Sequence, residues 1–89
     1  MNNSTIPDPI TLRRMILDRI GQRLQRMGMA ESDVSPGLDL VRSGLLDSLG
    51  FVDLVADLEQ ATGRRADLES ALTKPGATTV QGITELFTT

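Results

Sequence analysis

Apolar residues recur at steps of three and four positions along this 89-residue chain, and this spacing limits the fold more than any other feature. Residues so spaced lie on one side of an α-helix, whereas a half-buried strand needs strict alternation of apolar and polar residues. The chain has no stretch of strand-like alternation and no internal repeat. Its only aromatic residues are Phe51 and Phe87, so the core must be mainly aliphatic. We therefore predict an all-α domain.

Two long helices are predicted from their end signals and apolar stripes. Asp8 before Pro9 is typical of a helix start, and Gly28 is a suitable stop. The first stripe consists of Leu12, Met15, Ile16, Ile20, Leu24 and Met27. The second helix runs from about Ser48 to Thr62 and stops at Gly63. Its core-facing stripe consists of Phe51, Leu54, Val55, Leu58 and Ala61.

The remaining third of the chain predicts two shorter helices. Asp67 to Leu72 forms a short third helix, which Pro75-Gly76 ends. Thr78 and Gln81 have the spacing of a capping box, and a last helix follows them. This helix buries Val80, Ile83, Leu86 and Phe87. We expect a small four-helix bundle formed by a single domain, residues 1–89, with residues 1–7 as a disordered tail.

A long connection, Met29 to Leu46, separates the first two helices. Pro36-Gly37 and Ser43-Gly44 are turn signals within it. We expect Leu38, Leu40 and Val41 to anchor this loop on the bundle. A structureless loop of this length in a compact domain is uncommon and usually has a function.

The residue types that are missing exclude several functions. The chain has no cysteine and no histidine. Disulfides, thiolate metal sites, the usual zinc sites and Ser-His or Cys-His catalysis are therefore excluded, and we predict no metal site and no enzyme activity. The scarcity of aromatic residues argues against binding of single-stranded nucleic acid. We find no apolar run long enough for a membrane span and no signal-peptide pattern in residues 1–7, so we expect a cytoplasmic protein.

Acidic residues are concentrated in the middle of the chain. Residues 1–28 hold five arginines against two acids, residues 29–63 hold seven acids against Arg42, and residues 64–89 are balanced. An acidic middle segment favours a basic partner, although a solvated surface would have the same composition.

Ser48 lies where the long loop gives way to the second helix. Asp47 is a good N-cap, because its carboxylate can accept from the free N–H groups of the first helical turn. Ser48 then falls in that first turn, where another protein can reach its side chain. Because the chain has no histidine or cysteine to activate it, Ser48 is a better candidate for a modification site than for a nucleophile.

The segments Gly44-Leu45-Leu46-Asp47-Ser48-Leu49, Val52-Asp53-Leu54-Val55 and Leu58-Glu59 resemble the attachment site of acyl carrier proteins. The resemblance covers roughly residues 8–87. It implies that Ser48, with Asp47 and Leu49 beside it, receives 4′-phosphopantetheine from coenzyme A through a phosphopantetheinyl transferase. The thiol of that group would carry cargo as a thioester, and Asp47 would help to recruit the transferase and its metal ion. The resemblance also implies the carrier-protein bundle, in which the long first loop wraps the helices and delivers the serine.

The resemblance further implies a docking surface on the second helix. Leu49, Val52 and Ala56 fall on a different side from the core stripe, flanked by Asp53, Asp57 and Glu59. In carrier proteins the matching apolar positions meet partner enzymes. Without the resemblance, they would indicate only a wide apolar face of a buried helix. Asp53 and Asp57 also share a face, but paired carboxylates on an exposed helix are far more often solvated charges than acid–base catalysts.

We therefore expect a monomeric, non-enzymatic carrier that presents an acyl group to loading and downstream biosynthetic enzymes. The alternative is an aminoacyl or peptidyl carrier loaded by an amino-acid-activating enzyme, and a third possibility is an unmodified helical interaction module. Ala61-Thr62-Gly63-Arg64-Arg65 stands where housekeeping fatty-acid carriers have a denser acidic tract. This difference predicts a specialised standalone member of the family.

Overall fold

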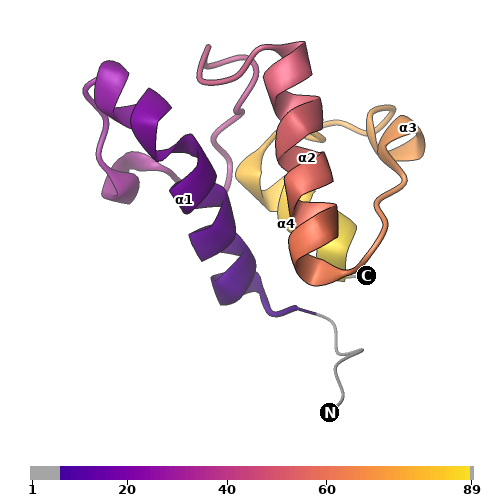
Figure 1. Cartoon of the computed structure of the whole chain (residues 1–89). Coiled ribbons are helices and arrows are strands. Elements are labelled where there is room, and N and C mark those ends of the chain that lie inside the picture. The colour runs from indigo at the N-terminus through magenta and orange to yellow at the C-terminus, as the bar shows by residue number, and fades with distance from the viewer. Residues whose placement is uncertain (1–6, 89) are drawn as a thin grey trace.

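The computed structural model describes residues 7–88, and in this range the chain forms helices joined by loops, without a strand (Figure 1). The elements are α1 (Pro9–Arg26), the 3₁₀-helix η1 (Glu31–Asp33), α2 (Ser48–Thr62), α3 (Leu68–Ala71) and α4 (Val80–Thr88). The predicted all-α fold is confirmed. The tail predicted for residues 1–7 lies, except for Pro7, outside the described residues.

The helix ends follow the signals in the sequence. At the start of α1 the Asp8 carboxylate accepts a hydrogen bond from the Thr11 N–H at 2.7 Å, and Pro9 takes the first helical position. At the end of α2 Gly63 adopts a left-handed φ of 71°, which costs glycine little. Its N–H donates to the Glu59 carbonyl at 2.9 Å. The predicted bounds of α2 agree with the structure.

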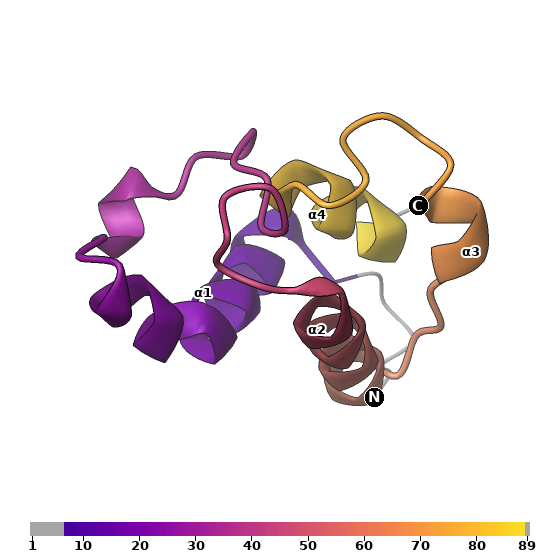
Figure 2. The same ribbon diagram turned by 90° about the horizontal axis from the view of Figure 1, so that it is seen from above.

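The core lies where α1 packs against α2 and α4, while α3 lies to one side (Figure 2). For two residues of the predicted core-facing stripes the predicted burial is wrong. Met27 is 46% exposed because it lies at the helix end, and Ala61 is exposed on the last turn of α2. Leu17, which the predicted stripe omitted, is buried. The fully buried larger side chains are Leu12, Ile16, Ile20, Val34, Leu40, Leu58, Ile83 and Phe87.

The predicted third helix is shorter than expected. Only four residues, Leu68–Ala71, are helical, and they form a single turn. Ala71 is buried and Leu68 packs partly against the core. Three longer helices, α1, α2 and α4, therefore supply most of the helical core in the described part of the chain. None of its helices has both the length and the apolar character needed to cross a bilayer.

The long loop is fastened to the start of α4. Leu40 N–H donates to the Thr78 carbonyl at 2.9 Å, and Val80 N–H donates to the Leu38 carbonyl at 3.1 Å. Leu40 is fully buried, and Leu38 and Val41 pack against the core, as predicted for the anchors of this loop.

Asp39 adds side-chain bonds to the same junction. Its Oδ1 accepts from the Thr78 hydroxyl at 2.7 Å and from the N–H groups of Arg42 and Val41 at 2.9 and 3.0 Å. Partial burial by itself would raise the pKa of Asp39, but these donors and the Arg42 charge hold that pKa below its ordinary value. The ionised form of Asp39 therefore stabilises the fold.

The predicted capping box at the start of α4 is wrong. Thr79, not Thr78, caps this helix, because its Oγ1 accepts from the Gly82 N–H at 2.9 Å. The Thr78 hydroxyl donates to Asp39 instead, and the Gln81 side chain donates to Glu85 at 3.3 Å. The pairing of the long loop with the residues before α4 shifts the helix start by one position.

Candidate functional site

Two buried leucines bring the long loop to the start of α2. Leu45 and Leu46 are both part of the core, and the Leu46 N–H donates to the Leu40 carbonyl at 2.8 Å. The next three residues leave the core, and Asp47, Ser48 and Leu49 are all exposed. The loop thus ends on a fixed anchor immediately before the exposed helix start.

Asp47 caps α2, as the sequence predicted. Its Oδ1 accepts a hydrogen bond from the Gly50 N–H at 2.6 Å. A Cβ atom on Gly50 would lie 3.1 Å from this oxygen, so a glycine there leaves the cap unstrained. The other carboxylate oxygen, Oδ2, makes no hydrogen bond with any residue in 7–88 and remains available to a partner or a cation.

Ser48 occupies the first position of α2, with its hydroxyl on the surface. The hydroxyl makes no hydrogen bond with another described residue, and it lies at the positive end of the helix dipole, which favours a negative group. The chain has no histidine or cysteine, and the residues described here contain no cluster suited to a metal ion. The start of α2 therefore leaves the Ser48 hydroxyl accessible from solvent.

The outer face of α2 exposes apolar side chains beside acids. Leu49 is 69% exposed and Val52 is 43% exposed, and Ala56 is exposed one turn further along. Asp53 and Asp57 are also exposed. The opposite face of the helix is buried through Phe51, Leu54, Val55 and Leu58. The predicted separation into a core face and a second, exposed face agrees with the structure.

The three acids predicted for docking have different surroundings. Glu59 is only half-exposed, and its Oε2 accepts from the Ala66 N–H at 2.8 Å. Asp57 Oδ2 lies 3.5 Å from Arg19 Nε of α1. Asp53 makes no hydrogen bond or ion pair with any residue that the structure describes. Arg19 had no signal in the sequence, because its partner lies on another helix.

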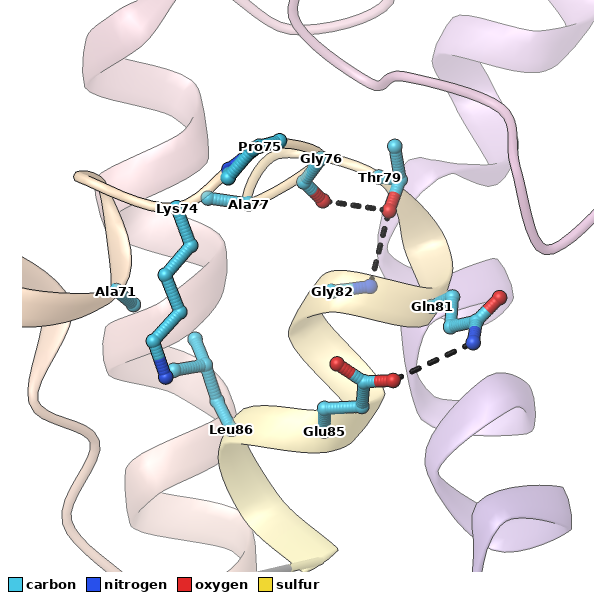
Figure 3. A pocket seen from close by; sticks show the side chains of 10 residues that line it. All are labelled: Ala71, Lys74, Pro75, Gly76, Ala77, Thr79, Gln81, Gly82, Glu85 and Leu86. Atoms are coloured by element: carbon cyan, nitrogen blue, oxygen red, sulfur yellow. Dashed lines mark hydrogen bonds between the residues drawn. The ribbon is translucent and has the colours of Figure 1, made fainter.

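A separate cavity of about 540 Å³ lies between α4 and the loop that precedes it (Figure 3). Its lining includes Lys74, Thr79 and Glu85, but none of the site residues predicted from the sequence. The loop lies so close to α4 that a Cβ atom on Gly82 would clash with the carbonyl oxygens of Gly76 and Ala77. Gly82 is thus a structural residue that sequence reasoning missed.

Comparison with known proteins gives one match. The sequence model of a family described as "Phosphopantetheine attachment site" matches residues 12–86. The comparisons with curated proteins and with solved structures gave no match. The matched range includes α2 and Ser48, the whole long loop and most of α4.

Proposed function

Because the chain belongs to the phosphopantetheine attachment family, a family of non-catalytic carrier domains, we propose that Ser48 is the residue that receives 4′-phosphopantetheine. The observation that carries this proposal is the exposed Ser48 hydroxyl at the capped start of α2, which makes no hydrogen bond within residues 7–88. Ser48 lies outside the apolar core, so a long group attached there need not displace any buried side chain.

The reaction at Ser48 is a group transfer from coenzyme A by a phosphopantetheinyl transferase. The Ser48 oxygen would form a bond to the phosphorus that bears pantetheine, and the pyrophosphate bond of coenzyme A would break. Adenosine 3′,5′-bisphosphate would leave, and the serine proton would pass to a base on the transferase. We propose that the free Asp47 Oδ2 contributes to binding the transferase and its metal ion. The start of α2 stabilises the negative phosphodiester through the helix dipole. Once attached, the group supplies the thiol that holds the cargo as a thioester.

We propose that the outer face of α2 presents this arm to partner enzymes. Leu49, Val52 and Ala56 supply the apolar contact, and the acids around them supply charge. Substitution of Asp53 and Asp57 by lysine should weaken partner binding, and added salt should weaken binding of the wild-type protein. A partner affinity that changes neither with the substitutions nor with salt would refute this docking surface.

Residues 1–89 then form a single carrier domain that acts as a monomer, and the short α3 completes a four-helix bundle of acyl-carrier type. The cargo is an acyl unit of a specialised pathway. This choice rests on the basic pair Arg64-Arg65 after α2, which a partner surface built for uniform negative charge would repel. A cargo of amino acids remains the alternative. The cytoplasmic location expected from the sequence stays a prediction.

The proposed function is tested by intact-mass measurement after incubation with a phosphopantetheinyl transferase, coenzyme A and Mg²⁺. We expect a mass increase of one phosphopantetheine group. No increase would favour the unmodified interaction module. The modified protein is then given separately to fatty-acid synthesis enzymes and to amino-acid-activating enzymes from the same source. Efficient elongation of fatty chains would refute the specialised carrier, and aminoacylation would establish the alternative.

A further inference from the structure

The three acidic residues of α2, Asp53, Asp57 and Glu59, differ in the contacts that their carboxylates make. Glu59 makes a hydrogen bond within the fold, because its Oε2 accepts from the Ala66 N–H at 2.8 Å. This bond spans the turn after α2 and joins the helix end to the segment that leads into α3. A partner that bound Glu59 would have to break it, so Glu59 is poorly placed to supply docking charge.

The charge of Asp57 is offset by a cation from another helix. Arg19 of α1 brings its Nε to 3.5 Å from Asp57 Oδ2. The Arg19 side chain is held there by a hydrogen bond from Nη1 to the Met15 carbonyl at 3.1 Å. The Arg19 Nε is buried and has no hydrogen-bond partner among residues 7–88, and the Asp57 carboxylate is the nearby group that balances its charge. Asp57 and Arg19 together present little net charge to a partner.

Asp53 has no cation beside it, in the described part of the chain, that offsets its charge. It is exposed, and no ion pair or hydrogen bond joins it to the rest of residues 7–88. It lies one helical turn after Leu49 and directly after Val52, and both of these apolar side chains are exposed. An uncompensated carboxylate therefore borders the apolar contact on the same face of α2.

We propose that Arg19 offsets Asp57, so that Asp53 alone among the three acids supplies the electrostatic contact of this face with a partner enzyme. The partner surface that fits is an apolar depression for Leu49 with one arginine or lysine beside it, at the distance of Asp53. The surplus of acids in residues 29–63 favours such a basic partner. This inference rests on the proposed function, because the partner used to test it is a phosphopantetheinyl transferase.

The test compares three variants that each remove one negative charge from α2: Asp53→Asn, Asp57→Asn and Glu59→Gln. Modification is followed by intact mass at several carrier concentrations, and melting temperature is measured for each protein. Asp53→Asn should raise the KM for the carrier about two- to fivefold and reduce its salt dependence, with kcat and melting little changed. Asp57→Asn should change KM by less, and Glu59→Gln should lower the melting temperature.

A second arm releases the charge of Asp57. Arg19→Gln removes the offsetting cation, so Asp57→Asn should raise KM more in this background than in the native sequence. The matched control is Arg23→Gln, which changes the net charge equally but removes an exposed arginine that is not paired with Asp57. In that background Asp57→Asn should keep its small effect.

The outcomes separate this inference from the function on which it rests. No modification of the wild-type protein would refute the proposed function, and the inference with it. Efficient modification of the wild type, with equal KM values for Asp53→Asn and Asp57→Asn in every background, would refute only the inference. The comparison of these two variants does not depend on the stability of Glu59→Gln.

Discussion

The starts of α2 and α4 have the same N-cap hydrogen bond but different surroundings. In each, a side chain at the N-cap accepts from the N–H of a glycine three residues later: Asp47 from Gly50 at 2.6 Å, and Thr79 from Gly82 at 2.9 Å. The residues that follow the two caps differ in their exposure to solvent. Ser48 is exposed, whereas Val80 is buried in the core.

The surroundings of the two glycines explain the difference. Above Gly82 the loop before α4 lies so close that no side chain would fit, and Thr79 also donates to the Gly76 carbonyl at 2.7 Å. Near Gly50 the closest atom is the tip of the Asp47 side chain. Capping therefore starts both helices, but tertiary packing decides that one start is a structural junction and the other an open site.

The largest loss of stability should come from a substitution of Gly82. In Gly82→Ala the new Cβ would clash with two backbone carbonyl oxygens, one of them the Ala77 oxygen at 2.8 Å. We expect a loss of about 3 kcal/mol or more in the free energy of unfolding, measured by denaturant titration.

Gly50→Ala is the matched control. Its contact at 3.1 Å is with a side-chain oxygen that can shift, and alanine favours a helix by about 1 kcal/mol over glycine. Its stability should stay within about 1 kcal/mol of wild type. Equal losses in the two variants would contradict the contrast between the helix starts.

The next effect concerns Asp39, which joins the loop before α2 to the residues before α4. Because folding lowers the pKa of Asp39, its contribution is present above its unfolded pKa, near 3.8, and is lost as the pH falls through the lower folded value. Asp39→Asn should be less stable than wild type at pH 7, and the difference should narrow below about pH 4. A constant difference from pH 7 to pH 2, measured by thermal unfolding, would contradict this role of the carboxylate.

The two N-caps should contribute similar amounts to stability. Asp47→Ala and Thr79→Ala should each lower the free energy of unfolding by about 1 kcal/mol. Only Asp47→Ala should also slow the transfer of phosphopantetheine at Ser48, because Thr79 lies away from the site. Transfer rates and denaturant titrations on both variants check this prediction, and equal slowing in both would indicate a general effect of lost stability.

The smallest effect on the fold should come from the site itself. Ser48→Ala removes an exposed hydroxyl that has no hydrogen-bond partner in the described part of the chain, and it should change the free energy of unfolding by no more than about 0.5 kcal/mol. The protein with and without phosphopantetheine should show similar circular dichroism, because the buried side chains of α1, α2, α4 and the long loop form the core, whereas Ser48 lies outside it. A disordered unmodified protein would contradict the description of this core.

The starts of α1 and α2 could be predicted from the sequence because their caps are local. Asp8 and Asp47 each bond an N–H three residues away, and Gly63 needs only its own φ. Residue spacing placed Leu49, Val52 and Ala56 on a different side of α2 from the core stripe, whereas their exposure was predicted from the resemblance to carrier proteins. The predicted role of Ser48 depended on the resemblance to carrier proteins, since no residue pattern by itself designates an attachment site.

The start of α4 and the Arg19–Asp57 pair could not be predicted in this way. Thr78 and Thr79 are both possible caps by sequence, and the choice is made by hydrogen bonds with the long loop, at Leu38 and Leu40. Arg19 and Asp57 are far apart in the sequence and meet only when α1 packs against α2. Local signals contain no information about either contact.

The most direct test of the account is to locate the attached group by peptide mapping with tandem mass spectrometry, after modification by a transferase with coenzyme A. We expect one phosphopantetheine per chain, on the peptide that contains Ser48, and none on Ser48→Ala under the same conditions. Phosphopantetheine on another serine, or on the Ser48→Ala variant, would contradict it.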